Sequence, residues 1–225
     1  MMDWIIRQTW KDVLMVHHQI DARELQQYIP FPLDLFEGSA LISIVPFRMS
    51  DIRFPFVPSV PMISSLWELN LRTYVRVGHE TGVYFLTLDS DSRLGVWIAR
   101  KFFSLPYRQV PLTAKSSQSL YVMKSSHLDH SFQMKTNLET VDASERELEM
   151  NRWATERYQL FTKKNNQTFR GRVRHQPWKL HPVKLELYDE NLTKMIGLKN
   201  SSKAAMGFYQ ESISVQFSPF EIIIS

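Results

Sequence analysis

Residues 66 to 77 read LWELNLRTYVRV, and residues 83 to 91 read VYFLTLDSD. Along the first run polar and apolar side chains alternate, as they do in a β-strand, where successive side chains point to opposite faces of the sheet. The polar break GHETG between the two runs is typical of a hairpin turn. The sequence therefore predicts an antiparallel hairpin, and the rest of the fold can be built outward from it.

One face of the first predicted strand carries four hydrogen-bonding side chains, Glu68, Asn70, Arg72 and Tyr74. This face can be the solvated side of a sheet. It can also be the polar floor of a barrel lumen, because small barrels line a ligand cavity with alternate residues of their strands. In that second interpretation Glu68 and Arg72 would hold each other ionised, and Asn70 would orient a ligand. The alternation by itself leaves both interpretations open.

Further β-rich runs on both sides of this hairpin predict a mainly β protein. ALISIVPF, residues 40 to 47, alternates and is expected to end as a strand at Pro46. LGVWIARKFF, residues 94 to 103, is interpreted as another strand that leads into a Leu-Pro-Tyr corner. KKNNQTFRGRVR, residues 163 to 174, predicts a hairpin with a solvated basic face. Other predicted strands are LYVMKSS (120–126), RYQLFTKK (157–164), KLELYD (184–189) and FYQESISVQF (208–217).

Two short helices are predicted from capping signals. Asp21 with Glu24 and Ser144 with Glu147 each have the spacing of a capping box, and the second helix is expected to run to about Ala154. Many strands, two short helices and no alternation of strand and helix predict a mostly antiparallel fold, closed or sandwiched. No linker or repeat interrupts residues 1–225, so we expect a single domain.

Composition excludes several functional classes. The 225 residues are 44% hydrophobic and contain no cysteine, which excludes disulfides, thiolate catalysis and cysteine metal sites. A net charge of +4 gives no strong reason to expect a nucleic-acid partner. Charged residues interrupt the N-terminal run MMDWIIRQTWKDVLMV, so neither a signal peptide nor a membrane span is expected there. We expect a soluble cytoplasmic protein with no cofactor and no membrane partner, and the oligomeric state stays open.

RKFFSLPYRQ, residues 100 to 109, resembles the nucleophile segment of acetoacetate decarboxylase, in which an arginine is followed after four residues by an aromatic residue, a proline and two lysines. Glu68 precedes Arg100 by the separation expected for the catalytic glutamate of that family. DARELQQYIPFPLDLFEGSALISIV, residues 21 to 45, resembles the helix, turn and strand of that family. VRHQPWKLHPVKLEL, residues 173 to 187, resembles its Val-x-His-x-x-Trp strand.

Within this superfamily the chain is more similar to a bacterial family of unknown function, the YqjF-like proteins. The matching motifs are ELNLRTYV (68–75), GVYFLTLDS (82–90), the Arg-to-Leu-Pro-Tyr segment, TERY (155–158) and HQPW (175–178). The resemblance implies a cone-shaped, mostly antiparallel β-barrel of the acetoacetate decarboxylase-like type, with its pocket inside. It favours the lumen interpretation of the polar strand face. The implied ligand-binding residues are Glu68, Asn70, Arg72, Tyr74, Arg100, Tyr107 and Arg108.

The resemblance also implies that the decarboxylase chemistry is lost. Tyr107 stands where that family has its Schiff-base lysine, and a phenol cannot form an imine with a ketone. Arg108 replaces the second lysine, and Val45 falls where the family has another acid. Glu68 and Tyr107 then remain as candidates for general acid–base work on an anionic or carbonyl ligand. For Arg100, a place in the pocket and a buried ion pair are both open.

Three functions are compatible with these residues. The favoured one is a small-molecule-binding barrel without catalysis, which takes an anionic or carbonyl-containing metabolite. The second is a lysine-independent acid–base enzyme, a lyase or isomerase on an oxo acid. The third is a protein-interaction module that uses the apolar segment FPFVPSVPMISSLW, residues 54 to 67, if its side chains stay exposed.

The remaining histidines and charged corners are expected to be structural. His17 and His18 are adjacent on a predicted strand, so they face apart and cannot share a metal. The run SHLDH, residues 126 to 130, could bind a cation in principle, but a surface loop is the better interpretation and we expect no metal. TERY is interpreted as an ion-paired corner. His175 is interpreted as a core histidine, with a place beside Trp178 at the barrel mouth as the alternative.

Overall fold

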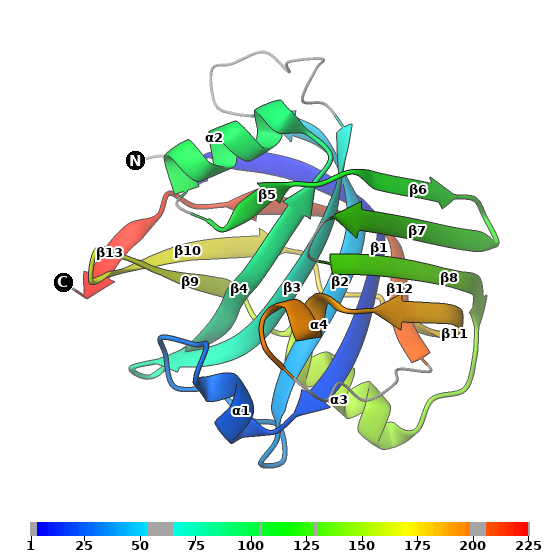
Figure 1. Ribbon diagram of the computed structural model, residues 1–225, viewed down its shortest axis with the longest axis horizontal. Helices are drawn as coiled ribbons and strands as arrows, with labels where there is room; N and C mark the ends of the chain where they lie inside the picture. The colour runs from blue at the N-terminus through cyan, green and yellow to red at the C-terminus, as the bar shows by residue number, and fades with distance from the viewer. Residues whose placement is uncertain (1–3, 54–64, 104, 128–129, 199–205, 225) are drawn as a thin grey trace.

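The computed structural model of the protein describes residues 4–53, 65–103, 105–127, 130–198 and 206–224, which form thirteen strands and four helices (Figure 1). The fold is mainly β, as the sequence predicts. The strands are β1 (Ile6–Ile20), β2 (Ala40–Arg53), β3 (Ser65–Val77), β4 (Glu80–Ser90), β5 (Tyr107–Gln109), β6 (Leu112–Ser116), β7 (Leu120–His127), β8 (His130–Thr140), β9 (Gln159–Lys164), β10 (Gln167–His175), β11 (His181–Glu190), β12 (Met206–Phe217) and β13 (Glu221–Ile224). The helices are α1 (Ala22–Gln26), α2 (Arg93–Phe103), α3 (Glu145–Thr155) and α4 (Leu192–Met195).

All described strands belong to one sheet. Its order is β13-β10-β9-β4-β3-β2-β1-β12-β11-β8-β7-β6, and β5 pairs with β4 beside this path. The pairings are antiparallel except those of β4 with β5 and with β9. The predicted hairpin is confirmed: β3 and β4 pair from Val77↔Glu80 to Glu68↔Ser90. Gly78 in the turn has φ 61°, a left-handed conformation that glycine adopts without steric cost.

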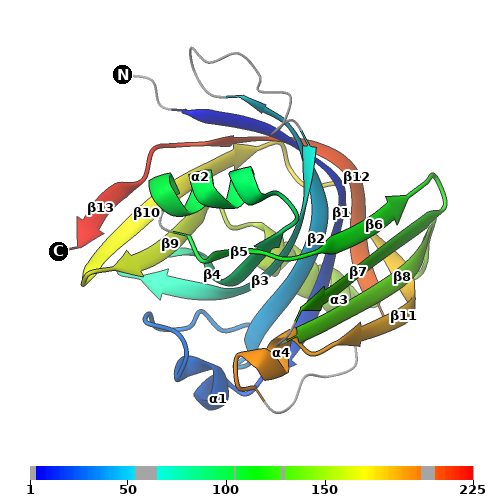
Figure 2. The same ribbon diagram turned by 45° about the horizontal axis from the view of Figure 1, so that its top comes forward.

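The strand pairings return on themselves in one part of the sheet. β10 pairs with β12 at Val173↔Phe217, in addition to its pairings with β9 and β13. The path from β10 through β9, β4, β3, β2 and β1 to β12 therefore leads back to β10. A single parallel bridge, Val83↔Leu160, joins β4 to β9. Figure 2 shows the sheet curving from β10 through β4 and β2 to β12. We call these seven strands the ring.

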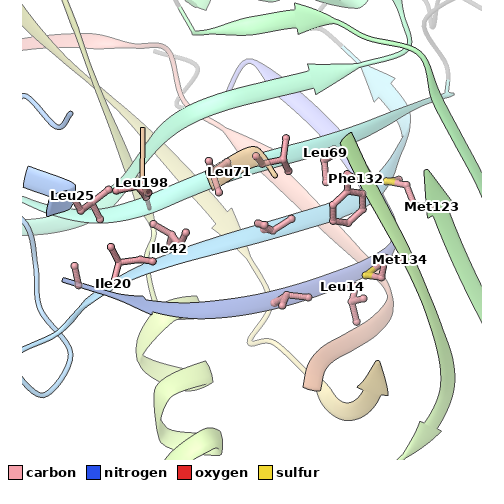
Figure 3. Close-up of a cluster of buried hydrophobic side chains, with 14 of the residues drawn as sticks. Leu14, Ile20, Leu25, Ile42, Leu69, Leu71, Met123, Phe132, Met134 and Leu198 are labelled. Atoms are coloured by element: carbon pink, nitrogen blue, oxygen red, sulfur yellow. The ribbon is translucent and has the colours of Figure 1, made fainter. Parts of the chain in front are cut away.

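Both faces of β3 are buried, and they have different chemistry. Leu69 and Leu71 belong to the main hydrophobic cluster, on the side of the sheet that contacts β7 and β8 (Figure 3). Each fully buried leucine or isoleucine stabilises the fold by about 2 kcal/mol. The opposite face carries the four predicted polar side chains, and all of them are buried as well. The interpretation of this face as the solvated side of a sheet is therefore wrong.

The segment 94 to 103, expected as a strand, forms the helix α2 instead, so this prediction is wrong. Ser92 caps the helix: its Oγ accepts a hydrogen bond from the backbone N of Gly95 at 3.1 Å. Val96 is buried while the next residue, Trp97, is 55% exposed, so only one side of the helix packs on the protein. A short apolar run of this kind is compatible with a strand or a helix. The N-capping serine before it is the feature that favours the helix.

β2 continues past Pro46 to Arg53, so the predicted end of this strand is also wrong. Proline has no N–H and is tolerated in a sheet only where no ladder hydrogen bond is needed. The register between β1 and β2 shifts between Lys11↔Arg48 and Val16↔Ile44, opposite Pro46. The irregularity in β1 therefore accommodates the proline inside an uninterrupted strand.

The two predicted helix N-termini and the second predicted hairpin are confirmed. Asp21 caps α1 by accepting from two backbone N–H groups, although this helix has only five residues. Ser144 and Glu147 form a complete capping box at the start of α3. β9 and β10 form the expected hairpin, with both turn asparagines, Asn165 and Asn166, at positive φ. No helix of the described residues is long and apolar enough to cross a membrane.

Candidate functional site

A cavity of about 140 Å³ lies inside the ring and extends to α2. β3 contributes Glu68, Asn70 and Arg72 to its wall, because residues two apart on a strand share one face. β5 contributes Tyr107, and α2 contributes Gly95 and Ala99. Most of the remaining wall is apolar. A few polar groups in an apolar cavity are typical of a small-molecule site.

Glu68 and Tyr107 meet in this cavity although 38 other residues separate them in the chain. The Tyr107 hydroxyl donates a hydrogen bond to Glu68 Oε2 at 2.7 Å. β5 brings the tyrosine there by pairing with β4 at Leu88↔Tyr107. Next along β5, Arg108 holds the fully buried Asp89 of β4 in a bidentate ion pair, with distances of 2.7 and 2.9 Å. This ion pair fixes β5, and with it the phenol, against the ring.

Burial raises the pKa of Glu68 to about 7. The residue is only 3% exposed, and removal from water disfavours the charged form of its carboxyl group. Two hydrogen bonds oppose this effect, one from Tyr107 and one from Asn70 Nδ2 to Oε1 at 3.2 Å. Burial, with the neighbouring Glu68 charge, raises the pKa of Tyr107 well above its usual value, so the phenol stays protonated. Glu68 can therefore gain or lose a proton near neutral pH.

Arg72 is buried, with 8% of its surface exposed, and it lines the same cavity. Its Nη2 donates to the sulfur of Met15 at 3.5 Å, and its Nε has no hydrogen-bond partner among the described residues. The expected ion pair between Glu68 and Arg72 is absent from this part of the chain, and the carboxylate contacts Tyr107 and Asn70 instead. Arg72 lies four positions after Glu68 on the strand, which separates the two Cα atoms by about 13 Å and explains this difference.

Unpaired polar atoms are concentrated around the cavity. Among the described residues, eight buried side-chain nitrogen or oxygen atoms have no hydrogen-bond partner, and five of them belong to residues that line the cavity. Such atoms are rare in folded proteins because each costs about 1–3 kcal/mol when left unpaired. The five atoms are Asn70 Oδ1, Arg72 Nε, Arg157 Nε, Gln159 Oε1 and Trp178 Nε1.

Three residues named from the sequence do not line the cavity. Tyr74 lies on the same face of β3, but its hydroxyl is 2.5 Å from Ser43 Oγ and its ring contacts Trp153 of α3. Arg100 is exposed on α2 and donates from Nε to the backbone O of Tyr107 at 2.5 Å. Arg108 is held by Asp89. Arg100 and Arg108 thus support the position of Tyr107 from outside the cavity.

Other residues of the cavity wall had been interpreted as structural. Arg157 forms an ion pair with Asp34 at 3.0 Å and also lines the cavity. His175 lines it too, and its Nδ1 is 2.7 Å from the backbone O of Gln176, which leaves Nε2 available to a ligand. Burial lowers the pKa of His175, so the ring is neutral at pH 7. The motifs TERY and HQPW contained these residues, but nothing in the sequence showed that they face Glu68.

The remaining candidates have structural roles or lie outside the described residues. His17 and His18 face apart, as predicted, and contact Ser43 and Tyr188 respectively. No group of three metal-ligating side chains occurs in the described ranges. The possible cation site at SHLDH includes residues 128–129, which are not described. The apolar segment 54–67 falls mainly on residues 54–64, which are likewise not described.

Residues 7–214 match the family DUF2071, described as an uncharacterized conserved protein. The chain belongs to the DUF2071 family. It is 32% identical over 221 residues to the uncharacterized protein YqjF of Bacillus subtilis strain 168, covering 96% of this chain and 91% of that protein. The resemblance to YqjF-like proteins is therefore confirmed, and at this identity the chain is a relative of the Bacillus protein.

Solved structures place this DUF2071 chain in the acetoacetate decarboxylase-like fold. An acetoacetate decarboxylase-like enzyme from Sphingomonas wittichii RW1 superposes with a TM-score of 0.68 at 12% identity, covering 99% of this chain and 94% of the other. The enduracididine biosynthesis enzyme MppR, solved with pyruvate, superposes with a TM-score of 0.65 at 8% identity, covering 99% and 91%. At such low identity the likeness establishes the fold and leaves the activity open.

Proposed function

We propose that the protein binds a small anionic, carbonyl-containing metabolite in the cavity of the ring, and that the ring is a cone-shaped β-barrel within a single domain of residues 1–225. The pairing of β10 with β12, which closes the path of strands, supports the barrel. The likeness to MppR, which was solved with pyruvate, supports a ligand of this class. The observation that carries the proposal is the buried guanidinium of Arg72, which has no acidic partner in the described residues and whose Nε has no hydrogen-bond partner there.

A buried arginine without an acidic partner is costly, and an anionic ligand would remove that cost. The guanidinium presents several N–H donors in a planar fork that matches a carboxylate. Arg72 has no ion pair in the described part of the chain, and its Nε has no partner at all. A ligand carboxylate would accept hydrogen bonds from this fork.

The carbonyl of the ligand is assigned to Glu68 and Tyr107. Near pH 7 a fraction of Glu68 carries a proton, because its pKa is about 7, and a protonated carboxyl donates a hydrogen bond to a carbonyl oxygen. Tyr107 stands where the resemblance places a Schiff-base lysine, and none of the described residues that line the cavity is a lysine. These observations support binding without an imine.

The proposal is tested by isothermal titration calorimetry with a panel of oxo acids: pyruvate, acetoacetate and phenylpyruvate. We expect at least one of them to bind, and Arg72→Met to weaken its Kd about tenfold or more, since a hydrogen bond to a charged group is worth about 1.5–3 kcal/mol. Arg146→Met is the matched control, because Arg146 is exposed and pairs with Glu37 at the surface. Binding that is insensitive to Arg72, or no binding at all, contradicts the proposal.

A second candidate is a lysine-independent acid–base enzyme, a lyase or isomerase acting on an oxo acid. The pKa of about 7 at Glu68 favours it, because a general base works best near the operating pH. Proton abstraction next to a carbonyl is measured by NMR as exchange of the pyruvate methyl protons in deuterium oxide. Enzyme-dependent exchange that is lost in Glu68→Gln establishes this activity, and exchange equal to that without protein excludes it for pyruvate.

A further inference from the structure

Aromatic side chains line the end of the cavity next to α2 and the start of β1. The Trp10 ring lies 6.3 Å from the Trp178 ring and 6.1 Å from the Phe217 ring, measured between centroids. All three residues line the cavity, together with Met49 and Leu66. We call these five residues the aromatic end. Trp10 Nε1 is already bonded to Gln8 at 2.8 Å, so this indole offers mainly an apolar surface.

Two small residues of α2 line the cavity, and one of them lies next to Leu66 of the aromatic end. Gly95 and Ala99 both line the cavity, and residues four apart lie on the same face of a helix. A Cβ at position 95 would lie 3.0 Å from Leu66 Cδ2, so α2 approaches β3 closely there. Ala99 is therefore the position of α2 at which a larger side chain would extend into the cavity.

The size and polarity of the cavity limit what can fill it. Pyruvate and acetoacetate are almost entirely polar, whereas the wall of this cavity is mostly apolar. An engineered apolar cavity of about 150 Å³ binds benzene. The cavity here, about 140 Å³, is of similar size. An aromatic ring is therefore about the largest apolar group for which the cavity has room.

The polar groups follow one another along β3 in an order that orients such a ligand. Leu66, Glu68, Asn70 and Arg72 alternate along the strand, with about 6–7 Å between successive members. The aromatic end thus lies at Leu66, the acid and phenol lie next, and the guanidinium lies beyond them. The Arg72 guanidinium reaches the sulfur of Met15, which lies near the level of Asn70, so a ligand with a carboxylate at one end and an aromatic ring at the other meets these groups in the same order.

We propose, building on the proposed function, that the ligand is an oxo acid bearing an apolar group about the size of a benzene ring, with its carboxylate at Arg72 and its ring at the aromatic end. Ala99 is a specificity-determining residue, because its small side chain leaves the space that the aromatic ring of the ligand occupies. Ring-to-ring contacts with Trp10 and Trp178 favour an aromatic group over an aliphatic one of equal size.

The test compares phenylpyruvate with pyruvate by isothermal titration calorimetry, in the wild type and in Ala99→Leu. We expect phenylpyruvate to bind the wild type about tenfold more tightly or better, since the added ring buries apolar surface. In Ala99→Leu the leucine occupies the space of the phenyl ring. Phenylpyruvate therefore loses its tighter binding, while the Kd of pyruvate changes less than about threefold. Pyruvate is thus the internal control for folding of the variant.

Each result separates the two proposals. Equal Kd values for the two acids in the wild type overturn the aromatic ligand and leave the binding function standing. Tighter phenylpyruvate binding that Ala99→Leu does not reduce overturns the placement of the ring at α2. No binding of pyruvate, acetoacetate or phenylpyruvate overturns both proposals. If Ala99→Leu does not fold, Ala99→Val applies the same comparison with a smaller side chain, and the wild-type ratio alone still decides the ligand class.

Discussion

Two groups of buried polar side chains lie side by side on the inner face of the ring, and only one of them is fully hydrogen-bonded. His17, Ser43 and Arg72 are direct cross-strand neighbours on β1, β2 and β3. His17 Nδ1 is 2.7 Å from Ser43 Oγ, and its Nε2 is 3.1 Å from Asn151 Oδ1. Tyr74 completes this group through Ser43. Arg72, on the next strand, belongs to the second group, the polar side chains that line the cavity. Its Nε has no hydrogen-bond partner among the described residues.

The difference separates a structural role from a binding role. The four residues His17, Ser43, Tyr74 and Asn151, which we call the histidine network, join three strands to α3 and satisfy one another inside the protein. A fully satisfied buried network makes one packing arrangement more stable than its alternatives. Five polar atoms of the cavity residues have no such partners in the described residues, so their cost is removed only if a ligand or water supplies hydrogen bonds. Burial alone would not have distinguished the two groups.

The largest expected effect comes from breaking the histidine network. His17→Leu removes both hydrogen bonds of the imidazole and leaves Ser43 and Asn151 buried without this partner. This should lower the free energy of unfolding by roughly 3 kcal/mol. Urea unfolding followed by circular dichroism measures this change. His79→Leu, in the exposed turn between β3 and β4, is the control and should change stability by less than about 0.5 kcal/mol. Equal effects of the two substitutions would show that the network contributes little.

The second effect is a pH dependence from Glu68. Its pKa is raised from 4.5 to about 7 in the folded protein, so between these values the folded state binds the proton more tightly than the unfolded state. Stability from this group is therefore present below pH 4.5 and is lost as pH rises to about 7. Between pH 5 and pH 8 the wild type should lose roughly 2 kcal/mol relative to Glu68→Gln.

Urea unfolding of both proteins at the two pH values measures the Glu68 contribution, and the difference between them cancels other titrating groups. His17 is one such group, and its slope has the opposite sign. Burial lowers its pKa from 6.5 to about 4, so its contribution is present above pH 6.5 and is lost as pH falls toward 4. A wild type and a Glu68→Gln variant with parallel pH profiles would mean that the Glu68 pKa is unperturbed.

The local parts of the fold could be predicted from the sequence because local chemistry determines them. Asp21 and Ser144 cap helices through their own side chains, and the alternation from Leu66 onward reflects the two faces of β3. α2 was missed because the ten residues 94–103 fit the period of a strand or of a helix, and the capping Ser92 lies outside this run. The extension of β2 beyond Pro46 was missed because it depends on an irregularity in β1.

The site could be predicted only where a motif linked distant segments. The resemblance placed Glu68 and Tyr107 in one pocket, and the hydrogen bond between them agrees with it. Arg157, Gln159 and Trp178 could not be assigned to the cavity, because they reach it through the pairing of β9 and β10 with the rest of the ring. Non-local strand pairing of this kind leaves no pattern in the local sequence.

The smallest effect on stability should come from Arg72→Met, although Arg72 is as buried as His17 and Asn151 of the histidine network. Methionine has a similar length and no charge, so it removes a buried guanidinium that has no acidic partner. The free energy of unfolding should stay within about 1 kcal/mol of the wild-type value, or rise, because an unpaired buried charge costs stability.

The same urea measurement, made without any oxo acid, decides this point beside His17→Leu. A loss of about 3 kcal/mol in Arg72→Met would place Arg72 in the histidine network across the β2–β3 pairing at Ser43, and the cavity would then lack its anion-binding group. Unchanged stability together with lost oxo-acid binding would mean that the cross-strand neighbours Ser43 and Arg72 have different roles. Ser43 would stabilise the ring, and Arg72 would bind the ligand without stabilising the ligand-free protein.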